Sequence, residues 1–205
     1  MTKASLAILK VGGSLFRWPE FPRRFAEMIE ARRVVSRGER LVLIAGGGPA
    51  ADVIRDLDKI HGLGDPSAHR LALHAMDLTA VILAELLPGT VPVQSLDALN
   101  AVWSAGAIPL LAPRLVLAEI ERLGEVSLPE NWDVTSDTIA ARVALHMAAD
   151  RLVLLKSAWL PPGTTRLEAA QLGLVDPLLP IVSRPLTQVE YLNLREPANE
   201  PRLLP

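Results

Sequence analysis

Three short apolar runs, each followed by a turn and a helical pattern, constrain the fold of this chain more than any other feature. The runs cover residues 6–11, 41–45 and 152–156, which is the length of a strand buried on both faces. Helical patterns lie between and around them, at residues 21–37, 49–60, 67–87, 115–123 and 136–149. Such alternation predicts parallel strands joined by right-handed helical crossovers. We therefore expect an α/β fold with three αβα layers and a mostly parallel central sheet.

Weaker patterns extend this alternation to the rest of the chain. They predict further strands at 91–94, 108–112 and 189–194, and helices at 95–104 and 166–172. After residue 156 the composition changes, because Pro161-Pro162-Gly163 opens a proline-rich tail. A chain of 205 residues is long enough for one domain with a substantial core. We expect a single domain, residues 1–205, with a soft boundary between two lobes near 157–160.

Composition and charge exclude several classes of protein. Half of the residues are apolar and the mean hydropathy is +0.28, which fits a sheet covered on both faces. The net charge of −2 and the lack of a long basic run argue against nucleic acid as a main partner. The chain has no cysteine, which excludes disulfides and thiolate metal sites. His74, Asp77 and Glu85 interrupt the longest apolar stretch and Lys10 interrupts the first one, so we expect no membrane span, no signal peptide and a cytoplasmic location.

Two lysines stand out because lysine is rare in this chain. It contains 17 arginines but only four lysines, and Lys10 and Lys156 each lie at the carboxyl end of a predicted strand. Open α/β sheets bind their ligands just outside these strand ends. Two compact positive charges at such positions predict a site that holds or transfers phosphate.

Glycine turns follow two of the predicted strands. Gly12-Gly13-Ser14 is either an ordinary tight turn or a cradle whose backbone N–H groups bind phosphate, and Lys10 favours the cradle. Gly46-Gly47-Gly48 costs conformational entropy on folding, which close approach of a ligand would explain. The segment from Gly46 to Ala51 also fits a dinucleotide fingerprint, but the acidic residue expected about twenty positions later is missing. The sequence therefore argues against an NAD-linked enzyme. The P-loop pattern is absent, which excludes a P-loop NTPase.

A third segment, Thr135-Ser136-Asp137, starts the helix predicted from residue 136. Its simplest interpretation is an N-cap, for which Thr135 or Ser136 is well suited. Capping does not require Asp137, however, and a carboxylate there could keep both lysines charged and oriented. His69 and Asp77, eight residues apart, are expected to share a helix face, but no third ligand has convincing spacing. We therefore expect no metal site built from side chains.

In this order along the chain, these segments resemble the amino acid kinase family. The resemblance rests on Lys10-x-Gly12-Gly13-Ser14, Gly46-Gly47-Gly48, Trp132-x-Val134-Thr135-Ser136-Asp137 and Lys156, and it covers about residues 5–157. Within the family, residues 68–77 and 132–137 are most similar to the [5-(aminomethyl)furan-3-yl]methyl phosphate kinases of methanofuran biosynthesis. The resemblance implies a kinase that uses ATP and Mg²⁺ and phosphorylates a small phosphorylated acceptor, such as an aminomethylfuran phosphate.

The resemblance also implies roles for individual residues. Lys10 and Lys156 would bind the transferred phosphoryl group, and Asp137 would organise the two lysines. Backbone N–H groups that bind nucleotide and acceptor phosphates would come from Gly12, Gly13, Gly46, Gly47 and Gly48, with Ser14 beside them. The acceptor pocket would be lined by His69, Met76, Asp77, Trp132, Thr135 and Ser136. Core packing explains Met76 and Trp132 equally well. Residues 1–156 would form the phosphate and acceptor lobe, and 157–205 a reduced nucleotide lobe.

Departures from the family pattern leave a second function open. The aspartate-glycine turn that usually follows the second lysine is replaced by Ser157-Ala158-Trp159, and only 49 residues follow Lys156. The alternative is a non-catalytic protein of the same fold that binds or stores nucleotides or oxoanions. Intact Lys10, Asp137 and Lys156 favour the enzyme. The resemblance further implies a homodimer or higher assembly, and the apolar helix at 67–87 either covers the sheet or forms that interface.

Overall fold

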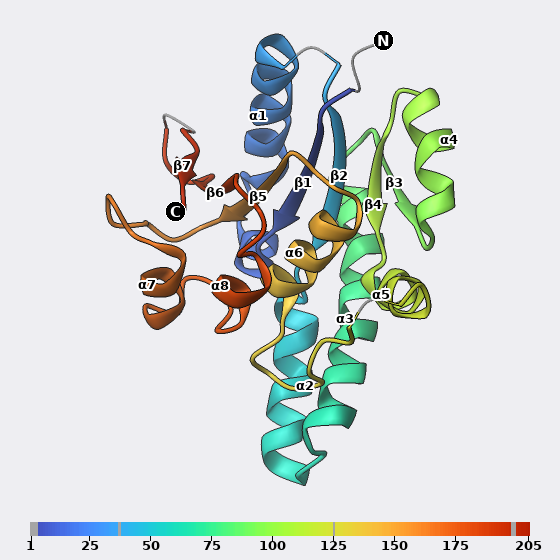
Figure 1. Cartoon of the computed structure of the whole chain (residues 1–205), viewed down its shortest axis with the longest axis vertical. Coiled ribbons are helices and arrows are strands. Elements are labelled where there is room, and N and C mark those ends of the chain that lie inside the picture. The colour runs from blue at the N-terminus through green and yellow to red at the C-terminus, as the bar shows by residue number, and fades with distance from the viewer. Residues whose placement is uncertain (1–3, 37, 125, 198–199) are drawn as a thin grey trace.

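The computed structural model describes residues 4–36, 38–124, 126–197 and 200–205, and it confirms the predicted three-layer α/β fold (Figure 1). Across these residues the central sheet has seven strands in the order β3-β4-β2-β1-β5-β6-β7. All neighbouring strands pair in parallel except β6 and β7, which are antiparallel. The strands are β1 (Leu6–Val11), β2 (Arg40–Ala45), β3 (Thr90–Val93), β4 (Ile108–Leu111), β5 (Arg151–Lys156), β6 (Val189–Asn193) and β7 (Arg202–Leu203).

Helices cover both faces of this sheet, with one hydrophobic cluster on each face. The helices are α1 (Phe21–Val35), α2 (Gly48–His61), α3 (Asp65–Leu86), α4 (Leu99–Ser104), α5 (Pro113–Arg122), α6 (Ser136–His146), α7 (Arg166–Gln171) and α8 (Leu179–Val182). Helix α1 and the carboxyl half of α3 pack on one face, while α5 and α6 pack on the other. Figure 1 shows α2 and α3 side by side, extending together away from the sheet.

Alternation along the buried strands decides toward which helix each side chain points. In β1, Leu9 packs with α1 on one face, whereas Ile8 packs in the cluster of α6 on the other. Lys10 follows Ile8 at period two, and Lys156 follows Leu154 in the same way in the neighbouring strand β5. Both ammonium groups are therefore directed to the face that α6 covers.

Most predicted elements lie within a few residues of their predicted positions. The helix predicted at 136–149 ends earlier, at His146, and the chain then turns through Ala148, whose φ is 48°. Three short elements had no counterpart in the sequence pattern, namely the 3-10 helix at Gly13–Arg17, α8 and β7. In the part of the chain that the structure describes, no helix is both long and apolar enough to span a membrane. The lobe boundary near 157–160 stays a prediction.

Candidate active site

Two ammonium groups share one buried carboxylate at the carboxyl ends of β1 and β5. The distance from Lys10 Nζ to Asp137 Oδ1 is 2.8 Å, and that from Lys156 Nζ to Asp137 Oδ2 is 2.6 Å. The side chain of Asp137 is only 2% exposed and that of Lys10 only 5%. The register of the sheet explains the convergence, because Lys10 lies opposite Leu154 and Lys156 is two residues further along β5. The first turn of α6 then places Asp137 between them.

The charged groups of this cluster shift one another's pKa values. Burial alone would raise the pKa of the Asp137 carboxyl, but the ammonium groups of Lys10 and Lys156 outweigh it and lower that pKa to about 2. Burial lowers the pKa of Lys156; the Asp137 carboxylate opposes this effect, and the charge of Lys10 adds to it. Asp137 is therefore ionised at neutral pH, and Lys156 holds its proton less firmly than a lysine in water.

An acidic residue that the sequence pattern did not indicate, Asp176, anchors the start of α6. Its Oδ2 accepts hydrogen bonds from the backbone N–H groups of Thr135 and Asp137, both at 3.0 Å, and of Thr138 at 2.9 Å. Its Oδ1 accepts a hydrogen bond from the Thr135 hydroxyl. Thr135 is the N-cap residue but makes no side-chain cap bond of its own. The cap that the sequence predicted from Thr135 or Ser136 is therefore supplied by a carboxylate from the tail.

The two glycine turns pack directly against each other. A Cβ atom on Gly13 would lie 2.5 Å from backbone atoms of Gly48, and one on Gly46 would lie 2.9 Å from the backbone nitrogen of Gly13. Gly12 meets a backbone oxygen of β5 in the same way, at 2.8 Å. Contact between backbones thus requires these glycines, whether or not a ligand is present. Gly13, Gly47 and Gly48 line a cavity, whereas Gly12 and Gly46 are buried.

This cavity has a volume of about 530 Å³ and lies between the glycine turns, the α2–α3 pair and residues 132–136. Among the residues predicted at the site, those that line it, besides the three glycines, are Ser14, His69, Met76, Trp132, Thr135 and Ser136. Arg17, Arg55 and Arg195 also line it together with Asp52, which lies 3.6 Å from Arg55, so its charged groups are mostly positive. Leu73 and Ile139 contribute apolar surface. A small anion with an apolar body fits such a lining.

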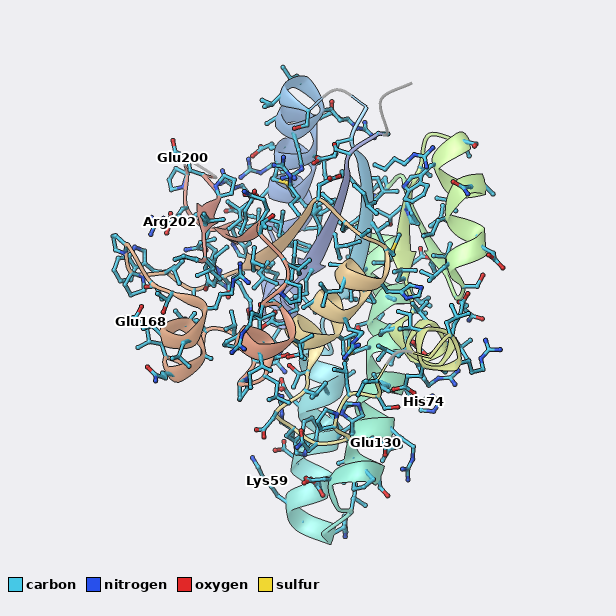
Figure 2. The ribbon with its side chains drawn as sticks, viewed as in Figure 1. Lys59, His74, Glu130, Glu168, Glu200 and Arg202 are labelled. Atoms are coloured by element: carbon cyan, nitrogen blue, oxygen red, sulfur yellow. The ribbon has the colours of Figure 1, made fainter. Side chains whose placement is uncertain are left out.

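Residues 128–135 close one side of the cavity by binding the α2–α3 pair. Trp132 Nε1 donates a hydrogen bond to Asp58 Oδ2 at 3.0 Å, and the Arg55 guanidinium lies 4.7 Å from the centroid of the Trp132 ring. An ion pair of 3.3 Å between Arg70 and Glu130 adds a second link to α3; Figure 2 labels Glu130 beside this helix pair. Trp132 is therefore a wall of the cavity. Met76, by contrast, both lines the cavity and belongs to the core.

The structure places Asp77 outside this cavity, against the predicted acceptor role. Its Oδ2 is 3.0 Å from Nε of Arg114 at the start of α5. His69 instead points to the loop, where its Nδ1 is 3.2 Å from the carbonyl oxygen of Asn131. The two side chains contact different elements, because eight residues turn an α-helix about 80° beyond two full turns. Within the described ranges, no three His, Asp or Glu side chains converge as metal ligands.

The segment after Lys156 links the two strand-end turns to the last strands. Ser157 Oγ lies 2.7 Å from Ser14 Oγ, which joins the turn after β5 to the turn after β1. The hydroxyl of the buried Tyr191 on β6 donates a hydrogen bond of 3.0 Å to the carbonyl of Ala158. The tail thus fixes the turn that departs from the expected aspartate-glycine pattern.

Residues 5–158, well over half of the chain, match the sequence model of the Amino acid kinase family. This chain belongs to the amino acid kinase family. A curated relative, the [5-(aminomethyl)furan-3-yl]methyl phosphate kinase of Methanocaldococcus jannaschii, is 30% identical over 134 residues. That match covers 65% of this chain and 57% of the relative, so the chain spans little more than half the length of that protein.

Solved structures of the same fold cover nearly the whole chain. The UMP kinase of Ureaplasma parvum has a TM-score of 0.63 at 14% identity, and the match covers 96% of this chain and 92% of that kinase. The UMP kinase of Bacillus anthracis has a TM-score of 0.62 at 14% identity, and the match covers 94% of this chain and 88% of that kinase. At these identities the likeness shows the amino acid kinase fold, including residues after Lys156, and nothing about the substrate.

Proposed function

We propose that this chain is an ATP-dependent kinase that transfers a phosphoryl group to a small phosphorylated acceptor. The observation that carries the proposal is the pair of lysines on one buried carboxylate, Lys10 and Lys156 on Asp137, at the edge where the glycine turns meet. Phosphoryl transfer depends on positioning and on neutralising charge that spreads over the phosphoryl oxygens. Two fixed ammonium groups with a shared partner that is ionised at neutral pH meet both needs.

The same residues fit the phosphates of a nucleotide. Lys156 and Lys10 offer donors, and the backbone N–H groups of Gly47 and Gly48 lie at the start of α2, where a helix favours negative charge. Mg²⁺, when bound with the nucleotide, supplies a further positive charge on the phosphate oxygens. In this proposal the lysines orient the transferred group, and the turns after β1 and β2 hold phosphates on either side of it.

The cavity supports a small phosphate ester as the acceptor. Three arginines and the glycine turns favour its phosphate, while Leu73, Met76 and Ile139 offer an apolar surface to its body. Such an acceptor is already an anionic nucleophile at neutral pH, so no general base is needed. The name of the Methanocaldococcus relative makes an aminomethylfuran phosphate the first acceptor to test.

The experiment is a transfer assay with Mg²⁺-ATP and a panel of phosphate monoesters, read by ³¹P NMR, with binding followed by calorimetry. Lys10→Ala should fold normally and lose about 10²- to 10³-fold in turnover, because one fixed charge on the transferred group is removed. Lys59→Ala is the matched control, since Lys59 lies exposed on α2 (Figure 2).

Three outcomes separate the candidate functions. Loss of turnover in Lys10→Ala but not in Lys59→Ala supports the kinase. Near wild-type turnover in Lys10→Ala would contradict the proposed site. Tight binding of Mg²⁺-ATP without transfer to any phosphate monoester would favour the binding or storage protein, for which the replaced segment from Ser157 onward is the structural argument.

A further inference from the structure

Asp176 lies in the tail between α7 and α8, far along the chain from the helix that it contacts. It is 8% exposed, and its partners Thr135, Asp137 and Thr138 lie 38 to 41 residues earlier. One carboxylate therefore satisfies three of the N–H groups that the first turn of α6 leaves without helical partners. One of these three N–H groups belongs to Asp137, whose side chain is the carboxylate shared by Lys10 and Lys156.

The same tail segment also contacts the cluster directly. Lys156 Nζ donates a hydrogen bond of 2.8 Å to the carbonyl oxygen of Leu174, two residues before Asp176. Both ends of the Lys156–Asp137 pair are thus held by residues 174–176, the lysine through a backbone carbonyl and the aspartate through its backbone N–H. A shift of this segment would move the lysine and the carboxylate together.

A simple helix cap does not explain this arrangement. Thr135 is a residue type that caps helices with its own side chain at no cost of burying a charge. Here its hydroxyl instead binds Asp176, and a carboxylate is brought into the interior. Burial raises the pKa of Asp176 and the nearby charge of Asp137 raises it further, so this position disfavours the ionised carboxylate, an effect that Lys10 and the hydrogen bonds from Thr135 and Thr138 oppose.

We infer that Asp176 is a positioning residue for the lysine cluster: by fixing the first turn of α6 from the tail, it sets where Asp137 meets Lys10 and Lys156. Its effect on turnover rests on the proposed function. It does not touch the transferred group but acts through Asp137. The tail after Lys156 then contributes to phosphoryl transfer, although its sequence departs from the family pattern.

The charged groups that face Lys156 set the expected pH behaviour. They are Lys10 from β1, Asp137 from α6 and Asp176 from the tail. The two carboxylates favour the protonated form of Lys156, while Lys10 and burial disfavour it. Removing the charge of Asp176 should therefore make Lys156 lose its proton at lower pH.

The test compares Asp176→Asn, which keeps the size and one acceptor oxygen, with Asp176→Ala. Two control variants remove carboxylates that also accept backbone hydrogen bonds: Asp150→Ala, which loses the 2.8 Å bond from Leu6 N–H at the opposite end of β1, and Glu168→Ala, which loses the capping box of α7. We expect kcat to fall about tenfold in Asp176→Asn and about a hundredfold in Asp176→Ala, because small displacements of catalytic groups have effects of this size. The alkaline limb of the kcat profile should move to lower pH in Asp176→Asn and stay in place in both controls.

A second measurement does not depend on turnover. The chain has four lysines, so ¹³Cε-labelled lysine gives a small set of NMR signals, and Lys156→Arg assigns the one of interest. We expect Lys156 to titrate at lower pH in Asp176→Asn than in the wild type. This measurement also decides the inference if Asp176→Ala fails to fold.

The outcomes separate the inference from the proposed function. If the wild type transfers phosphate to no acceptor, the kinase proposal falls, yet a shifted Lys156 titration in Asp176→Asn still supports an action of Asp176 on the lysine cluster. If Lys156 titrates identically in both proteins, the inference is overturned whether or not the protein is a kinase. If the wild type is active and Asp176→Asn has the same kcat, the inference is also overturned.

Discussion

At the scale of single residues, the lysine cluster has one negative charge for two positive ones. When Lys10, Asp137 and Lys156 are all ionised, these three groups carry a net charge of +1. The carboxylate of Asp176 also acts on Lys156, but among the described residues it binds backbone N–H groups of α6 and forms no ion pair with either lysine. A buried charge without a full partner is costly, and an anion that enters beside it gains more than it would at a solvated surface. This imbalance is the physical reason to expect a phosphate oxygen next to the two ammonium groups.

The low pKa of Asp137 predicts a specific loss of stability in acid. Its folded pKa of about 2 lies below the ordinary value of 3.8, so its contribution is fully present above pH 3.8 and is lost as the pH falls toward 2. The difference corresponds to about 2 kcal/mol of unfolding free energy. Lys10→Met removes one ammonium group, so the folded pKa of Asp137 should rise. The part of the unfolding free energy that is lost in acid should then be smaller than in the wild type. Urea unfolding from pH 5 to 2 should show the wild type losing its advantage over Lys10→Met, and parallel curves would contradict the assigned cause.

Sequence reasoning could reach the lysines and Asp137 but not Asp176. Lys10 and Lys156 stand at strand ends, and Asp137 follows a recognisable cap pattern, so each carries a local signal. Asp176 lies in Val175-Asp176-Pro177, which looks like an ordinary turn, and its partners are about 40 residues away. Asp77 was misplaced for a related reason, since helical spacing gives a rough face but not the neighbour, Arg114, that lies there.

At the scale of elements, the turn after β1 and the turn after β2 behave as one unit. Their glycines were expected to make room for a ligand, and the structure shows that they first make room for each other. A Cβ atom on Gly13 would collide with the backbone of Gly48, which forms the start of α2. Any phosphate held at Gly47 and Gly48 therefore depends on how closely the first turn packs.

Gly13→Ala tests this dependence. We expect it to push the two turns apart, to destabilise the fold by about 1–3 kcal/mol as overpacking does, and to weaken binding of Mg²⁺-ATP measured by calorimetry. Gly62→Ala is the control, because Gly62 has a φ of 61° but no atom within 4 Å of an added Cβ. It should cost stability through backbone strain alone and leave binding unchanged. Equal affinity in both variants would show that the packing of the turns does not shape the phosphate site.

Element prediction succeeded where the signal is local and failed where it is not. The buried strands read as apolar runs, and the helices between them were found from spacing and glycine stops. Helix α8 has four residues and β7 has two, too few for any periodicity to emerge. The position of β7 depends on its antiparallel pairing with β6 across a loop, which only the folded chain provides.

At the scale of the whole molecule, helix α3 presents an unusual outer surface. Its inner side packs in both hydrophobic clusters through residues such as Met76 and Leu83. On its outer side Leu71, Leu78, Ile82 and Leu86 are 40%, 55%, 43% and 37% exposed and form an apolar stripe roughly 22 Å long, beside which Val81 is 53% exposed. We propose that this face binds a second copy of the chain, since a long apolar stripe in water is unfavourable and typical of an interface.

Leu78→Glu tests this assembly because it puts a charge at the centre of the stripe without touching the core. We expect the wild type to sediment as a dimer or larger assembly at micromolar concentration, and Leu78→Glu to sediment as a monomer with little change in the unfolding of the single chain. Leu167→Glu is the control, since Leu167 is 60% exposed on α7, which lies at the left of Figure 1, away from α3. It should leave the assembly intact. A monomeric wild type would contradict the proposal outright, whereas loss of assembly in both variants would place the interface elsewhere.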